Sequence, residues 1–253
     1  MNEIMGWLLD IYADSEDGVV LWLLGEDGRR YRLRHAFAVT FYAAGPATRL
    51  RQLWRYLQSQ PVAVNLERTR REDLFSGMCT VLAVQVPNAA AQERLFQETA
   101  NRFPDLDYYD ADVPLALRYG AIHGTFPLAR CRARVDDDGR LKRITPLESP
   151  WELDPSLPPL RVLTIEADVD PAHASPSHLE LHCGRASYHL PLDNERGLLV
   201  NLKAILTNQD PDLILTRRGD TWLFPHLFEL AQRCGIPFNP NRDPQRQVLQ
   251  RKE

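Results

Sequence analysis

Two short segments of the sequence place arginine at every second position. The six arginines are Arg30, Arg32, Arg34, Arg130, Arg132 and Arg134. Side chains alternate between the two faces of a strand, so the three guanidiniums of each segment are expected on one face. Guanidinium groups suit phosphate oxygens, and the pattern predicts a surface that follows a nucleic-acid backbone without reading its sequence. The alternative is a solvated face whose arginines are held in salt bridges.

Further arginines lie beside aromatic residues, which adds the chemistry of base stacking. Arg49, Arg51 and Arg55 flank Trp54 in a predicted helix. Three others fall in a predicted loop: Arg68, Arg70 and Arg71. Tyr31 and Trp54 can stack on bases if their rings are exposed. A solvated, salt-bridged face is again the alternative for each group.

Four histidines gather in the second half of the chain, at His173, His178, His182 and His189. Metal binding is one interpretation, because imidazole is a common zinc ligand. The intervening Leu179 and Leu181 favour a strand whose polar side faces water. We therefore expect no metal site here.

A proline-rich segment, Leu147–Leu160, divides the elements that must position these residues. Prolines interrupt both helices and central strands. We expect a β-rich amino-terminal domain over residues 1–150 and a mixed α/β domain over residues 151–253, so the fold class is α/β, or α+β overall. In the first domain, strands are expected at 18–25, 29–35, 81–86 and 130–135, and helices at 47–60 and 89–103. In the second, strands are expected at 161–165, 179–183, 186–190 and 213–215, and helices at 198–206 and 222–233.

The composition is that of a globular protein: 253 residues, 44% of them hydrophobic. A formal net charge of −4 excludes a global positive field, so any nucleic-acid surface must be a local patch. The four cysteines form no C-x-x-C pair, which argues against a zinc knuckle and fits a reducing compartment. Without an apolar run near the ~20 residues of a membrane span, we expect a cytoplasmic protein.

Several segments resemble family B DNA polymerases, in the order of that family. Asp210–Leu215, followed by Gly219-Asp220 and Phe224–Leu227, is similar to the second motif of the proofreading exonuclease domain. Leu160–Asp168 falls where the first motif, an apolar strand ending in D-x-E, belongs. Gly6–Tyr12 and Tyr108–Tyr119 resemble the family's opening and the segment before its exonuclease domain. The resemblance implies an amino-terminal domain joined to a partial, RNase H-like exonuclease domain.

That family implies carboxylates around two divalent metals, and this sequence departs from the pattern. Glu166-x-Asp168 exchanges the two residue types of the first motif. Arg218 stands at the asparagine position of the second motif and Leu223 at its catalytic aspartate, while Asp220 keeps a supporting position. An aliphatic side chain cannot bind a metal, and a guanidinium competes with one. The third motif is expected beyond residue 253.

We therefore expect Glu166, Asp168 and Asp220 to be vestigial, with no bound metal and no catalysis by this chain alone. The predicted role is template contact and scaffolding in DNA replication or repair, with DNA and a polymerase core or carboxy-terminal continuation as partners. One alternative is an active 3′–5′ exonuclease that needs Mg²⁺ or Mn²⁺. The other is a protein-interaction module that does not touch DNA. A split-gene subunit, a truncated gene product and an excised segment are equally compatible with the sequence.

Overall fold

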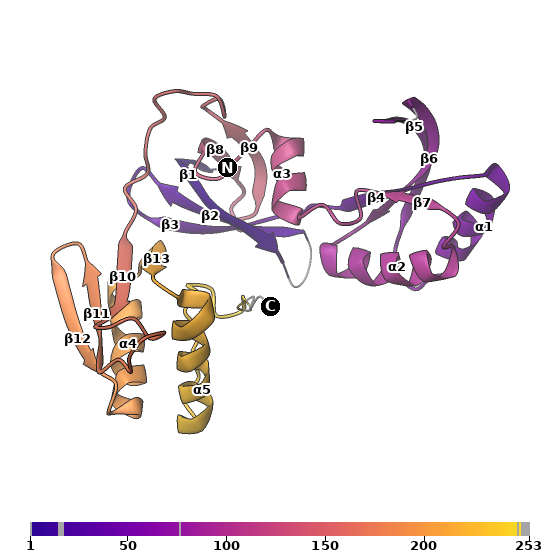
Figure 1. The fold of residues 1–253 in the computed structure, drawn as a ribbon. Helices are drawn as coiled ribbons and strands as arrows, with labels where there is room; N and C mark the ends of the chain where they lie inside the picture. Colours follow the sequence, from indigo (N-terminus) through magenta and orange to yellow (C-terminus); the bar gives the residue numbers. More distant parts are fainter. Residues whose placement is uncertain (1, 15–17, 76, 247, 249–253) are drawn as a thin grey trace. The chain divides into compact units, whose positions relative to one another are not determined.

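The computed structural model describes residues 2–14, 18–75, 77–246 and 248. The chain divides into two compact units, Met1–Pro158 and Pro159–Glu253 (Figure 1). The division falls inside the proline-rich segment Leu147–Leu160. Each unit has its own hydrophobic cores. No helix among the described residues is long and apolar enough to cross a membrane.

A five-stranded antiparallel sheet holds both arginine-rich segments of the first unit. Its order is β3-β2-β1-β8-β9. The strands are β1 (Asn2–Ala13), β2 (Val19–Gly25), β3 (Arg30–His35), β8 (Arg130–Val135) and β9 (Leu141–Pro146). The Asp27-Gly28 pair between β2 and β3 predicts a tight hairpin, and the two strands form it. Gly28 in the turn has a φ of 77° that favours glycine. Helix α3 (Leu115–His123) packs against β1.

The second sheet of this unit has the order β5-β6-β4-β7 and carries two helices. Its elements are β4 (Val39–Ala44), α1 (Ala47–Gln58), β5 (Asn65–Asp73), β6 (Gly77–Val86), α2 (Ala89–Arg102) and β7 (Asp107–Tyr109). Helix α1 buries Leu53 and Leu57, as its helical spacing predicts. Helix α2 is capped by Asn88, whose side chain accepts a hydrogen bond from the Ala91 amide.

The second unit contains a four-stranded mixed sheet in the order β12-β11-β10-β13. The chain runs through β10 (Val162–Ala167), β11 (His178–Cys183), β12 (Ala186–Pro191), α4 (Glu195–Gln209), β13 (Leu213–Thr216), the π-turn η1 (Gly219–Leu223) and α5 (Phe224–Cys234). Strand β13 is parallel to β10, and the other pairs are antiparallel. The predicted order of elements in this unit, three strands, a helix, a strand and a helix, is confirmed. The fold is α+β overall, as predicted.

Three local predictions were wrong. Arg68, Arg70 and Arg71 do not lie in a loop but in β5, which pairs with β6 along its whole length. The apolar run at 213–215 predicts a buried strand, but β13 is an edge strand whose Leu213 and Leu215 are 43% and 47% exposed. The last α-helix begins at Phe224 rather than at residue 222, because the preceding five residues form a wider π-turn.

Candidate nucleic-acid interface and nuclease-like site

Strand β8 separates its arginines from its apolar residues as alternation requires. Cys131 and Ala133 are fully buried in the core, while Arg132 and Arg134 are exposed on the other face and Arg130 is half-buried there. The apolar residues anchor the strand against the core. The three arginine side chains of β8 therefore leave the strand in a row on its other face.

The register of the sheet places the arginines of β3 on the same face as those of β8. Residues opposite one another in an antiparallel pair point to the same side. Arg30 lies opposite Leu24, Leu24 opposite Trp7, and Trp7 opposite Arg130. The two rows are thus three strand spacings apart, or roughly 14 Å at about 4.8 Å per spacing. The hydrogen bond from the Trp7 indole to the Ser156 carbonyl shows that the proline-rich segment crosses this face.

Positive charge outnumbers negative charge at one end of this face. Arg134 lies opposite Arg143 of β9, and Arg132 lies opposite Thr145. These four residues line a hollow of about 170 Å³. Glu3 is the carboxylate paired with both Arg132 and Arg134, at 3.5 and 3.4 Å. We call Arg132, Arg134 and Arg143 the β8–β9 arginine cluster.

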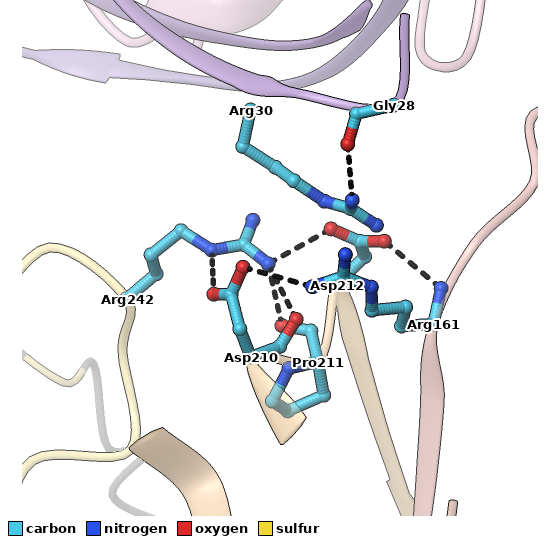
Figure 2. A network of polar contacts seen from close by, with 7 residues as sticks. All are labelled: Gly28, Arg30, Arg161, Asp210, Pro211, Asp212 and Arg242. Carbon is cyan, nitrogen blue, oxygen red and sulfur yellow. Dashed lines mark hydrogen bonds and ion pairs between the residues drawn. The ribbon is translucent and has the colours of Figure 1, made fainter. Parts of the chain in front are cut away.

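The remaining arginines of the two rows have local partners. Arg130 donates a hydrogen bond to Glu26 from Nε at 2.7 Å. Arg34 forms an ion pair with the buried Asp14 at 3.1 Å. Arg30 donates to the Gly28 carbonyl within its own hairpin (Figure 2). The alternative of salt-bridged arginines therefore applies to Arg34 and Arg130, which each have their own carboxylate, and in part to Arg132 and Arg134, which share Glu3.

A second basic surface lies between α1 and the strands β5 and β6. A pocket of about 720 Å³ there is lined by Leu50, Trp54 and three arginines: Arg51, Arg55 and Arg68. Trp54 is half-buried and forms part of the pocket wall. Across the described part of the chain, neither the Arg55 nor the Arg68 side chain forms a hydrogen bond or ion pair. The helix pattern of Arg51, Trp54 and Arg55 is visible in the sequence, but Arg68 joins them only through strand β5, where the sequence predicts a loop.

Other predicted members of the basic and aromatic groups are engaged elsewhere. The Arg49 guanidinium is paired with Asp105. The Arg49 guanidinium carbon also lies 5.1 Å from the centroid of the Phe103 ring. The Arg71 guanidinium carbon lies 5.4 Å from the centroid of the Tyr42 ring. The Tyr31 hydroxyl donates to Asp27 at 2.6 Å, which raises the pKa of this phenol.

The first nuclease-like carboxylates lie at the end of β10. Asp168 accepts hydrogen bonds from the Ser177 amide at 2.9 Å and the Ser177 hydroxyl at 2.7 Å. The hydroxyl contributes most to holding the pKa of Asp168 at about 2, so this carboxylate stays ionised and fastens the loop before β11. Glu166 lies opposite Glu180 of β11 and 3.8 Å from the Arg217 guanidinium.

The second nuclease-like motif is organised around a core residue. Leu223 is only 1% exposed and packs in the core of the second unit. Arg218 pairs with Asp170 at 2.6 Å, and Asp220 stands in the first turn of η1. Among the residues described, the carboxylates of Glu166, Asp168 and Asp220 do not gather into a set of three metal ligands.

The D-P-D segment is held by an arginine that the sequence patterns did not single out. Arg242 donates to the Asp210 carboxylate at 2.6 Å and to that of Asp212 at 2.8 Å (Figure 2). Its Nη2 also donates to the Asp210 and Pro211 carbonyls at 3.0 Å. Asp212 accepts from the Arg161 amide at 2.9 Å, so it ties the start of β13 to the residue before β10. Two carboxylates and two carbonyls so close together in the sequence indicate that a cationic side chain binds them. The residues around the D-P-D segment do not identify Arg242, which follows 30 residues after Asp212.

This chain is similar to known proteins in part of its sequence and in most of its fold. No protein-family model matches it. A stretch of 60 residues is 33% identical to DNA polymerase 1 of Pyrococcus abyssi, covering 24% of this chain and 8% of that protein. The same match is found for strain GE5 / Orsay of that organism.

The solved family B DNA polymerase of the hyperthermophilic archaeon Pyrobaculum calidifontis matches 94% of this chain, with a TM-score of 0.70 and 22% identity. The chain covers 34% of that polymerase, so it spans about a third of its length. This chain therefore has the fold of the amino-terminal part of a family B DNA polymerase, and the resemblance predicted from its motifs is confirmed.

Proposed function

We propose that this chain contributes template-strand contact and scaffolding to a family B DNA polymerase that acts in replication or repair in the cytoplasm. In this proposal, single-stranded DNA lies against the β8–β9 arginine cluster, at one end of the face that carries both arginine rows. The chain itself performs neither nucleotide transfer nor exonucleolytic cleavage. Its partners are DNA and a polymerase core or carboxy-terminal continuation.

The β8–β9 arginine cluster is the observation that carries the proposal. Like charges directly opposite one another in a sheet are destabilising, yet Arg134 and Arg143 form such a pair. Glu3 balances one of the three guanidinium charges. A bound phosphate would relieve the remaining repulsion, because guanidinium donors match phosphate oxygens.

The pocket beside α1 supplies a place for a base. Trp54 gives the pocket an aromatic wall, and its three arginines can hold the phosphates on either side of a stacked base. Stacking on an aromatic side chain is worth about 1–3 kcal/mol per base and tolerates any sequence. The combination suits a strand that is bound for its backbone and not for its bases.

The absence of catalysis is supported by what the nuclease-like residues do instead. Asp168 is occupied by two hydrogen bonds from Ser177, and Leu223 is part of the core. A two-metal site needs carboxylate oxygens at both positions. We therefore propose that this chain has no nuclease metal and no cofactor for DNA cleavage.

Fluorescence anisotropy with a labelled single strand and a labelled primer–template tests the proposal. Replacing the β8–β9 arginine cluster by glutamine should weaken binding and reduce the salt slope by about 2, at about 0.7 per lost phosphate contact on single strands. A matched control removes three exposed arginines from other surfaces: Arg94→Gln, Arg185→Gln and Arg196→Gln. The control should bind like the unaltered chain.

Two results would favour the alternative functions. If the unaltered chain binds no DNA at low salt, a protein-interaction role replaces the DNA role. The structure offers one surface for such a role, since Leu74 and Phe75 in the turn after β5 are 89% and 92% exposed. If Mg²⁺ or Mn²⁺ causes shortening of the strand on a gel, and Glu166→Ala abolishes it, the chain is a nuclease.

A further inference from the structure

The outer face of the β11–β12 hairpin brings three potential metal ligands together. Leu179 and Leu181 point into the core, so His178 and Glu180 share the opposite face. The register then places His189 of β12 directly opposite Glu180. Backbone pairing alone therefore gathers two imidazoles and one carboxylate.

The distances within this group fit a metal site with small side-chain adjustments. One ligand atom from each of His178, Glu180 and His189 lies within 4.8 Å of the other two. His178 Nε2 is 3.6 Å from Glu180 Oε1. Ligand atoms about 2.1 Å from a tetrahedral zinc are separated by roughly 3.4 Å. The two imidazole rings have centroids 3.9 Å apart and planes 32° apart, so they must separate and turn for both to bind one ion.

The hydrogen bonds around His178 leave its lone pair facing the group. The Ser177 hydroxyl gives its proton to Asp168, so its oxygen, 2.9 Å from His178 Nδ1, acts as the acceptor there. In the tautomer with its proton on Nδ1, the ring has its lone pair on Nε2, which faces a carboxylate oxygen of Glu180. A cation between these two atoms would be bound by both.

Asp168 completes an arrangement that is common around metal-binding histidines. Its Oδ2 lies 3.4 Å from His178 Nδ1. A carboxylate on the far side of a ligating imidazole fixes the ring's orientation and raises its basicity. Asp168, which resembles a nuclease ligand in sequence, occupies this supporting position instead.

We infer that His178, Glu180 and His189 bind a divalent transition-metal ion, with Zn²⁺ as the ion best matched to two imidazoles and one carboxylate. The fourth position is open to water or to His182, whose Nε2 lies 3.9 Å from the other Glu180 oxygen. This site is separate from the nuclease metals and independent of the proposed DNA contact. Imidazole ligands disfavour Mg²⁺ and Ca²⁺, which take oxygen ligands.

Isothermal titration of the full chain with ZnCl₂, under reducing conditions, tests the inference. We expect one equivalent of Zn²⁺, and visible absorption of bound Co²⁺ should report a tetrahedral site. His178→Ala and His189→Ala should each weaken binding more than tenfold, and Asp168→Asn about tenfold, as for other supporting carboxylates. His173→Ala, which removes an exposed histidine of the same unit that stands outside the group, should leave the affinity unchanged.

The inference is overturned if the unaltered chain takes up no Zn²⁺, or if His178→Ala and His189→Ala bind it as tightly as the unaltered chain. Thermal unfolding of each variant without metal checks that the hairpin is intact. His189→Gln serves as a second variant, since it keeps a polar side chain on the exposed strand. Loss of affinity in both His189 variants, with unchanged unfolding, supports the site; unchanged affinity in both contradicts it.

Discussion

Replacing Leu223 distinguishes a structural position from a vacated catalytic one. The side chain is 1% exposed and belongs to the core that joins β10, β11, α4 and α5. Truncating a leucine in such a core costs about 2–5 kcal/mol in the free energy of unfolding. In a domain of about 60–100 residues each kcal/mol shifts Tm by about 4–8 °C, so Leu223→Ala should lower the Tm of the second unit by at least about 8 °C.

Leu223→Asp, which restores the residue type of the nuclease motif, should destabilise the unit at least as much as Leu223→Ala. It adds the desolvation of a carboxylate to the loss of apolar packing. Urea unfolding followed by circular dichroism measures both, and Leu213→Ala is the matched control because Leu213 is 43% exposed. The control should change stability by less than about 0.5 kcal/mol, as surface substitutions do.

The opposite pattern would refute the reasoning about this position. If Leu223→Asp unfolds at the same urea concentration as the unaltered chain, the site can solvate a carboxylate. If the same variant also shortens a labelled single strand when Mg²⁺ or Mn²⁺ is added, the position is one substitution away from catalysis. Leu223 would then be a lost ligand and not a core residue.

Three further outcomes are expected. Arg242→Ala should lower the Tm of the second unit, since charge-assisted hydrogen bonds are worth about 1.5–3 kcal/mol. Arg242→Lys should recover only part of the loss, because lysine lacks the planar guanidinium that donates to several acceptors at once. The stabilisation from Asp168 should be complete above its unfolded pKa near 3.8 and should vanish as the pH falls toward about 2; a carboxyl NMR titration should show Ser177→Ala raising that pKa. Burial, with repulsion from neighbouring positive groups, lowers the pKa of His35 to about 4. The first unit should therefore lose stability as the pH falls from about 6.5 to about 4, because the unfolded chain binds the proton more readily. Thermal unfolding of His35→Gln should show a weaker dependence on pH over this range.

Alternation and helical spacing were enough to predict the elements that bury one face. The row Arg130, Arg132 and Arg134 was predictable because Cys131 and Ala133 fill the core between them. The element order of the second unit was predictable for the same reason. Each of its strands and helices contributes a continuous apolar face to one core.

The features that failed to be predicted depend on partners distant in sequence. Strand β5 is an edge strand with charged residues on both faces, so Arg68 and its neighbours carry no apolar alternation to reveal it. The shared face of the two arginine rows follows from the register of four strands, and the pairing of Glu180 with His189 follows from the register of two. Local sequence does not encode these registers by itself.

The exposed leucines of β13 have a consequence for the association of separate molecules. An open sheet edge is a template on which another chain can add a strand, and apolar edges are prone to uncontrolled stacking. Strand β13 spans only four residues, Leu213–Thr216, and is followed by the charged pair Arg217 and Arg218. A ladder that short ends after a few hydrogen bonds, and the charged side chains beyond it interrupt the apolar edge. The short strand and the charges that follow it therefore limit the growth of this edge into fibres.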